Sequence, residues 1–178
     1  MQTVIEKQNK AFGVLKESLG LSNIMESPRL VKAVVSVGTG SFKDKKKNEV
    51  VEDRLMKITG QKASPRGAKK SIASFKLRQG EPVGYQVTLR GKRMRDFLDR
   101  LLNTALPRTK DFKGISTSSV DEMGNLTIGI KEHSIFPEAA DEELKDVFGL
   151  AVTVVSTATS KEAARAFFTQ LGFPFRKE

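Results

Sequence analysis

Residues 62–95 read KASPRGAKKSIASFKLRQGEPVGYQVTLRGKRMR and carry the strongest structural signal in the chain. The stretch holds ten lysines or arginines against a single acid, Glu81. Apolar and polar residues alternate in two runs within it, at residues 73–78 and 83–90. Because successive side chains of a strand point to opposite sides, each run predicts a strand with one apolar face and one polar, basic face.

The short linker of residues 79–82 contains Gly and Pro, so the two runs predict a β-hairpin. Its polar face would gather Ser74, Lys76, Arg78, Gln86, Thr88 and Arg90 on one surface. Such a cationic surface, rich in hydrogen-bond donors, suits a phosphate backbone. Phe75 and Tyr85 are expected on the apolar face. Contacts to the phosphates, 2′-hydroxyls and shape of a folded RNA are therefore favoured over stacking on its bases.

The remaining pattern predicts an α+β fold. Helices are expected at residues 3–19, after the lysine-rich residues 43–47 to about residue 59, after Gly91 to about residue 105, in a short segment ending at Gly149, and near the C-terminus. Further strands are expected at residues 30–37, 115–120, 126–130 and 150–156. Short connections favour a largely antiparallel sheet of about five to six strands, with helices on one face and the other face free for RNA. We interpret residues 1–178 as one domain, with an N-terminal helix in residues 1–25 and an extended basic loop and hairpin in residues 62–82.

Composition excludes several classes of function. The chain has 178 residues, a formal net charge of +10 and no cysteine, which excludes disulfides, thiolate catalysis and cysteine-based zinc sites. His133 is the single histidine. No cofactor or metal is expected. The positive charge indicates a polyanionic partner. No apolar run of about 18 residues is present, so we expect a soluble, cytoplasmic protein with no membrane partner.

Catalytic residues are not predicted. Asp96 and Asp99 share a helix face but lie among arginines, and His133 is expected to be a packing residue. The glycines of residues 37–41 lack the third glycine of a dinucleotide-binding fingerprint. Two alternatives stay open beside a structural RNA-binding role. The first is a basic RNA-processing enzyme that uses Asp96, Asp99 or Glu132, and the second is a general polyanion-binding module.

Several longer motifs, in order, resemble one protein family. They are the segments ITGQK (58–62), AKKSIASFKLRQGEPVGYQVTLRGKRMRDFLDRL (68–101), ALPRTKDFKGIS (105–116), GNLTIGIKE (124–132), IFPE (135–138) and LGFPF (171–175). The chain resembles the large-subunit ribosomal proteins that bind 5S rRNA, over nearly its whole length. The resemblance implies a structural component of the ribosome, in its central protuberance.

The resemblance also implies partners and sites. Expected partners are 5S rRNA, large-subunit rRNA, peptidyl-site tRNA, neighbouring large-subunit proteins and small-subunit ribosomal protein thirteen. The expected RNA-binding residues are Gln61, Lys62, Arg66, Lys69, Lys70, Ser74, Lys76, Arg78, Gln86, Thr88, Arg90, Gly91 and Arg93. An acidic segment would supply the bridge to the small-subunit protein, through Glu138, Asp141, Glu142, Glu143 and Asp146. The chain departs from the usual family pattern at residues 37–41, 132–134 and 126.

Overall fold

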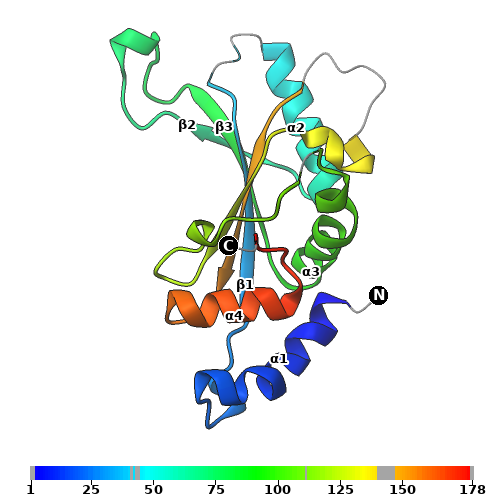
Figure 1. Cartoon of the computed structure of the whole chain (residues 1–178). Helices are drawn as coiled ribbons and strands as arrows, with labels where there is room; N and C mark the ends of the chain where they lie inside the picture. The colour runs from blue at the N-terminus through cyan, green and yellow to red at the C-terminus, as the bar shows by residue number, and fades with distance from the viewer. Residues whose placement is uncertain (1–2, 41, 43–44, 111, 140–146, 177–178) are drawn as a thin grey trace. The chain divides into compact units, whose positions relative to one another are not determined.

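The computed structural model describes residues 3–40, 42, 45–110, 112–139 and 147–176 (Figure 1). Its α-helices are α1 (Val4–Leu19), α2 (Lys45–Thr59), α3 (Gly91–Arg100) and α4 (Lys161–Leu171). Its strands are β1 (Leu30–Gly38), β2 (Ser64–Gly67), β3 (Pro82–Leu89), β4 (Leu126–Ile130) and β5 (Leu150–Ser156). The predicted α+β fold is confirmed.

The five strands form one sheet in the order β2-β3-β1-β5-β4. Neighbouring strands run antiparallel. The Thr39 N–H, just past the end of β1, donates to the Val83 carbonyl at the start of β3 over 2.9 Å. The Thr157 N–H, just past the end of β5, donates to the Arg29 carbonyl just before β1, also over 2.9 Å. The prediction of a largely antiparallel sheet is therefore confirmed, with five strands.

Burial alternates along the strands, as expected for a sheet with one covered face. In β3, Tyr85, Val87 and Leu89 are buried, whereas Gln86 and Thr88 are half-buried. The alternation predicted for residues 83–90 is thus confirmed from Tyr85 to Arg90, but not at Val83 and Gly84, which are half-buried and buried. The burial of β1, β4 and β5 follows the same period of two.

Packing divides the chain into two compact units. The first comprises Met1–Ala33, Arg90–Ile128 and Thr153–Glu178, and the second comprises Val34–Leu89 and Gly129–Val152. The interpretation of residues 1–178 as one domain stays a prediction. No helix in the described part of the chain combines the length and apolar character that a membrane span requires.

The first unit is built on three packed helices. α1 contacts both α4 and α3, and Phe97, Phe167 and Phe168 are fully buried. Polar contacts fix α1 at its N-terminal end. The Val4 N–H donates to Asp99 Oδ1 over 2.9 Å, and Lys7 Nζ donates to the Leu171 carbonyl over 2.9 Å. Five further residues, Leu101–Ala105, continue α3 as a π-helix before Pro107, so the helix predicted for residues 91–105 is present with a wider final turn.

The strand predicted at residues 115–120 is wrong. Thr117–Ser119 form a 3-10 turn, capped by Ser116 Oγ, which accepts from the Ser118 N–H. Ile115 instead forms an isolated parallel bridge with Phe175, near the C-terminus. Val120, at the other end of the segment, keeps an isolated antiparallel bridge with Leu126, so the local pairing that the apolar pattern indicated is reduced to one residue pair.

The second unit places α2 against β3. Val51, Leu55 and Ile58 lie on the buried side of α2, at the helical spacing that the sequence predicts. The short helix predicted to end at Gly149 is not present in its described part: Pro137–Ala139 form only a 3-10 turn, and residues 147–149 are irregular. Its middle, residues 140–146, lies outside the described residues.

Candidate nucleic-acid interface

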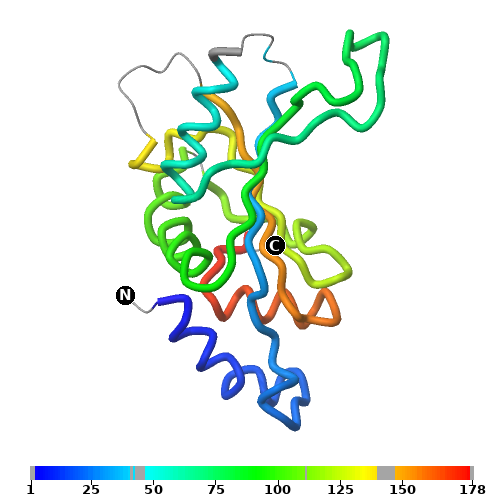
Figure 2. Tube along the Cα trace, turned by 180° about the vertical axis from the view of Figure 1, so that it is seen from behind, coloured from blue at the N-terminus to red at the C-terminus, as the bar shows by residue number. Residues whose placement is uncertain are grey.

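The predicted hairpin exists, but with a different first strand. β2 (Ser64–Gly67) pairs antiparallel with β3, with Ser64 opposite Gln86 and Arg66 opposite Gly84. Residues 73–78 are not a strand: Ala73–Phe75 form a 3-10 turn, and Lys76 is left-handed at φ 51°. The linker predicted at residues 79–82 is therefore wrong. The connection spans residues 68–81, which we call the finger (Figures 1 and 2).

This pairing changes which side chains share a surface. Residues directly opposite in an antiparallel ladder lie on the same face of the sheet. Ser64 and Arg66 of β2 therefore lie with Gln86 and Thr88 of β3, on the side away from Tyr85 and Val87. We call Ser64, Arg66, Gln86 and Thr88 the β2–β3 face. The prediction that Ser74, Lys76 and Arg78 line this face beside Gln86 and Thr88 is wrong, because these three residues belong to the finger.

Backbone hydrogen bonds close the finger along its length. At its base, the Ala68 N–H donates to the Glu81 carbonyl (2.8 Å) and the Gly80 N–H to the Ala68 carbonyl (3.0 Å). Near its tip, Ile72 and Leu77 exchange two such bonds, of 3.0 and 3.2 Å. Side chains add two more, because Ser71 Oγ accepts from the Gln79 N–H and Glu81 Oε2 from the Arg78 N–H, each over 2.9 Å.

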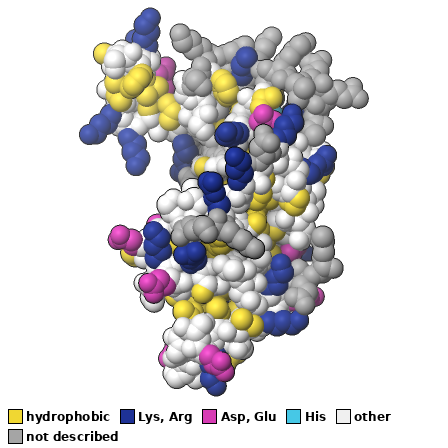
Figure 3. Space-filling view, in the orientation of Figure 1, with side chains coloured by type: hydrophobic (Ala, Val, Ile, Leu, Met, Phe, Trp, Pro, Cys, Tyr) yellow, Lys and Arg dark blue, Asp and Glu magenta, His cyan; other side chains and the backbone are white. Residues whose placement is uncertain are grey.

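The basic side chains of the finger are exposed. They are Lys69, Lys70, Lys76 and Arg78, and Ser74 at the tip is exposed as well. Figure 3 shows dark-blue basic side chains around a yellow apolar cluster where the finger lies, at the upper left. Phe75, a residue of the finger, is 77% exposed. The expectation that Phe75 faces the core is wrong.

Gln61 and Lys62 lie where α2 leads into β2. Gln61 Nε2 is 3.5 Å from the Thr88 carbonyl, which joins this segment to β3. Lys62 Nζ lies 3.9 Å from Glu52 Oε1, with its side chain 81% exposed. A pair that is so long and so exposed holds the lysine only weakly, so its charge is available to solvent or to an anion.

Arg90, Gly91 and Arg93 form the start of α3, in the first unit. All three are exposed, and Arg90 is the N-terminal cap residue without a side-chain capping bond. Gly91 has φ 58°, a left-handed conformation that favours glycine. These residues directly follow β3 in sequence.

Part of the acidic segment is described. Glu138 is exposed in the 3-10 turn Pro137–Ala139, and Arg54 Nη1 of α2 donates to the Ala139 carbonyl over 3.2 Å. The other predicted bridge residues, Asp141, Glu142, Glu143 and Asp146, lie outside the described residues.

His133 packs as the sequence predicts. Its ring is buried and stacks on Phe148, with 4.2 Å between ring centroids and 6° between planes. Nδ1 accepts from the Phe148 N–H over 3.3 Å. Asp99 likewise serves structure by accepting from the Val4 N–H, so neither residue is poised for acid–base chemistry.

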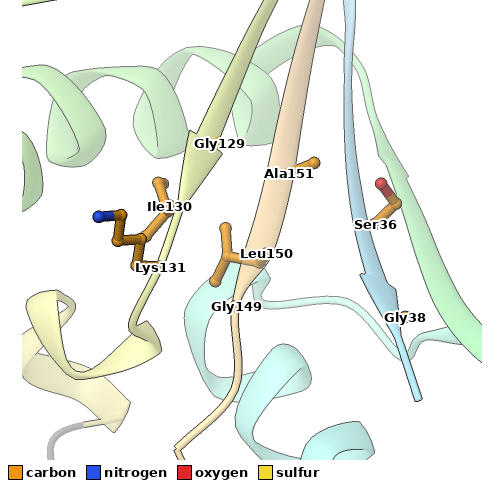
Figure 4. A pocket seen from close by; sticks show the side chains of 8 residues that line it. All are labelled: Ser36, Gly38, Gly129, Ile130, Lys131, Gly149, Leu150 and Ala151. Carbon is orange, nitrogen blue, oxygen red and sulfur yellow. The ribbon is translucent and has the colours of Figure 1, made fainter. Parts of the chain in front are cut away.

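One hollow of about 530 Å³ lies on the second unit (Figure 4). β1, β4, β5 and the adjoining residues line it with Ser36, Gly38, Gly129, Ile130, Lys131, Gly149, Leu150 and Ala151. Lys131 is the single charged group of this lining, so the hollow offers no acid–base pair. No group of three or more potential metal-ligating side chains occurs in the described part of the chain.

Sequence reasoning missed the true extent of the finger. The signal for it was a pair of glycines, one at each side of its base. A Cβ on Gly67 would lie 3.0 Å from the Gly80 carbonyl oxygen, so the two sides of the finger approach each other closely at its base.

The structure is that of an α+β protein with an exposed basic finger. Comparison with known proteins then defines the family. The family model for ribosomal protein L5 matches residues 23–78, and the companion model for the C-terminus of the same ribosomal family matches residues 82–175. The chain belongs to the ribosomal protein L5 family, which is a family of structural proteins and not of enzymes.

Curated relatives match over nearly the full length. The chain is similar to large ribosomal subunit protein uL5 of Flavobacterium johnsoniae, with 44% identity over 97% of the chain and 94% of the relative. It is 48% identical to the protein of the same name from Trichlorobacter lovleyi, over 95% of each chain. The Rubrobacter xylanophilus protein of that name is 48% identical, over 91% of each.

Proposed function

We propose that the chain is a structural component of the large ribosomal subunit, located on ribosomes in the cytoplasm, that binds 5S rRNA and helps attach it in the central protuberance. The observation that carries this proposal is family membership over nearly the whole chain. The net charge of +10 and the exposed basic residues of the second unit support it, because neutralising phosphates supplies most of the affinity for RNA.

The β2–β3 face is the proposed surface for 5S rRNA. Thr88 and Gln86 offer hydrogen-bonding groups, and Arg66 adds a charge on the same side of the ladder. Gln61 and Lys62 adjoin this face through the contact of Gln61 with Thr88. We assign Arg90, Gly91 and Arg93 to the same RNA, since they follow β3 directly in sequence.

The finger is the proposed contact to large-subunit rRNA or to peptidyl-site tRNA. Lys69, Lys70, Lys76 and Arg78 are exposed and can meet phosphates. The acidic segment, Glu138 to Asp146, is the proposed bridge to small-subunit ribosomal protein thirteen. Its acidic side chains suit a basic partner. Neighbouring large-subunit proteins complete the proposed set of partners.

Binding to 5S rRNA tests the proposal. Affinity for 5S rRNA and for an unrelated RNA duplex is measured at several salt concentrations, for the wild type and for the double variant Lys62→Glu with Arg66→Glu. We expect wild-type protein to prefer 5S rRNA at every salt concentration. The variant should lose that preference, and the magnitude of its salt slope should fall by roughly 0.7–0.9 per phosphate contact removed.

Lys161→Glu is a control. Lys161 is exposed at the first turn of α4, where a carboxylate is favoured by the helix dipole, so the fold should tolerate the change. This variant should keep the preference for 5S rRNA. Equal wild-type affinity for 5S rRNA and the duplex would instead indicate a general polyanion-binding module.

A further inference from the structure

The tip of the finger carries an exposed aromatic ring where the sequence pattern predicts a buried one. Phe75 is 77% exposed, and Ile72, in the same finger, is 42% exposed. Tyr85, the aromatic residue of β3, is only 8% exposed. The sequence pattern disfavours base stacking only if both rings face the core, and Phe75 does not.

The backbone holds Phe75 in a defined turn. Ile72 and Leu77 form an antiparallel bridge that closes residues 73–76 into a loop. Within it, the Lys76 N–H donates to the Ala73 carbonyl over 3.0 Å. Lys76 adopts the left-handed conformation that lets a short turn close, although a residue with a Cβ disfavours it. A ring on a closed turn loses less freedom on binding than one on an open loop.

The basic side chains of the finger indicate which kind of partner the Phe75 ring would bind. Lys69, Lys70, Lys76 and Arg78 are exposed within the same finger, whereas the carboxylate of Glu81 accepts from the Arg78 N–H. An exposed aromatic ring among basic side chains is the combination that binds unpaired nucleic acid, with the rings stacking on bases and the charges on phosphates. A paired base is already stacked within its helix, so an unpaired base offers the accessible face.

We propose that Phe75 stacks on an unpaired base of RNA, while the basic side chains of the finger hold the adjoining phosphates. This inference rests on the proposed contact of the finger with RNA and adds a second mode of recognition to it. The finger then distinguishes an RNA loop or end from a regular duplex, which contact with phosphates alone cannot do.

Fluorescence quenching of 2-aminopurine tests the proposal on the full chain. This base analogue loses fluorescence when an aromatic ring stacks on it, and electrostatic binding elsewhere on the protein does not produce that signal. The probes are a short single-stranded RNA with 2-aminopurine at its centre and a blunt RNA duplex with the same base in a paired position. The proteins are the wild type, Phe75→Leu and Phe75→Tyr.

We expect wild-type protein to quench the single-stranded probe at saturation and to leave the duplex probe unchanged. Phe75→Leu keeps an apolar side chain but removes the flat ring, so quenching should disappear and affinity for the single strand should fall by about 5- to 150-fold. Phe75→Tyr should retain both the quenching and the affinity. Lys69→Glu with Lys70→Glu should weaken binding but keep full quenching at saturation.

The outcomes separate this inference from the proposed function. Equal quenching by wild type and Phe75→Leu would overturn the stacking role, as would the failure of wild-type protein to quench the single strand. Neither result affects the preference for 5S rRNA over an unrelated duplex, which tests the proposed function by itself.

Discussion

The packed helices of the first unit and the finger of the second are ordered by different forces. α3 carries Phe97, α4 carries Phe167 and Phe168, and each of these rings is fully buried. The finger buries no comparable side chain, and its shape comes from backbone hydrogen bonds and two side-chain acceptors. The helices therefore use their apolar residues for stability, whereas Ile72 and Phe75 of the finger are exposed.

Removing a ring from the packed helices should give the largest effect on stability. Phe168 contacts Phe167 and Phe173, with ring centroids 5.7 and 5.3 Å apart. Phe168→Ala should lower the free energy of unfolding by about 3–5 kcal/mol, because it removes buried area and leaves a cavity. Denaturant unfolding followed by circular dichroism measures the change.

Phe75→Ala is the matched variant in the finger. Its ring is exposed, so the free energy of unfolding should stay within about 0.5 kcal/mol of wild type. A large loss of stability in this variant would show that the finger is packed after all, and the contrast between the two regions would fail.

A second prediction concerns the strand that leads out of the finger. A Cβ on Gly84 would lie 2.5 Å from the Val37 carbonyl oxygen, which belongs to the neighbouring strand and cannot move freely. Gly84→Ala should cost about 1–3 kcal/mol in the free energy of unfolding. In Gly129→Ala the new Cβ meets no atom within 4 Å, so this control should be neutral or slightly stabilising. Equal thermal shifts for the two variants would contradict the close approach at Gly84.

A third prediction applies to the tip alone. Lys76 has φ 51°, where glycine fits without the strain that a Cβ brings. Lys76→Gly should stabilise the closed tip by about 1 kcal/mol and leave global unfolding unchanged. Hydrogen exchange of the Ile72 and Leu77 amides, which close the turn, measures this directly. Ser74→Gly, which places glycine in the 3-10 turn, should speed exchange instead.

The smallest predicted effect appears only at alkaline pH. Burial raises the pKa of Tyr85 above its ordinary value of 10.0, and the charges of Glu52 and Glu49 raise it further. The folded protein therefore keeps the phenol proton when the unfolded chain has lost it. Below pH 10 the raised pKa does not change the free energy of unfolding. Above pH 10 the free energy of unfolding falls as the pH rises. Tyr85→Phe should show a shallower alkaline decline in stability, and an unchanged decline would contradict the raised pKa.

The elements that the sequence predicts correctly are those with a buried, periodic face. Val51, Leu55 and Ile58 mark α2 by their helical spacing, and the alternation in residues 83–90 marks β3. The buried face of a helix or strand must be apolar whichever part of the chain packs on it. Its apolar spacing can therefore be seen in the sequence before the packing is known.

The finger and residues 115–120 could not be predicted in the same way. The alternation in residues 73–78 resembles that of a strand, but the first strand of the hairpin is Ser64–Gly67. This strand contains Pro65 and Gly67 and has low strand propensity. Ile115 pairs with Phe175, a partner 60 positions away. Short backbone pairings such as these do not require a periodic pattern of apolar side chains, so the sequence does not reveal them.

The candidate site also has a part that the sequence predicts and a part that it does not. The sequence and the family resemblance nominated the basic residues, and the structure places Lys69, Lys70, Lys76 and Arg78 in the finger and Gln86 and Thr88 on the β2–β3 face. The exposure of Phe75 could not be predicted, because it depends on a turn that Lys76 closes in a conformation rare for lysine.

The close approach of Gly67 to Gly80 marks the base of the finger, and the Ile72–Leu77 bridge marks the start of its tip. Residue pairs inserted between these two points would carry Phe75 outward by roughly 3.3 Å per pair, the rise of an extended chain. The length of the finger can thus change while its base stays in place, and no core residue has to repack.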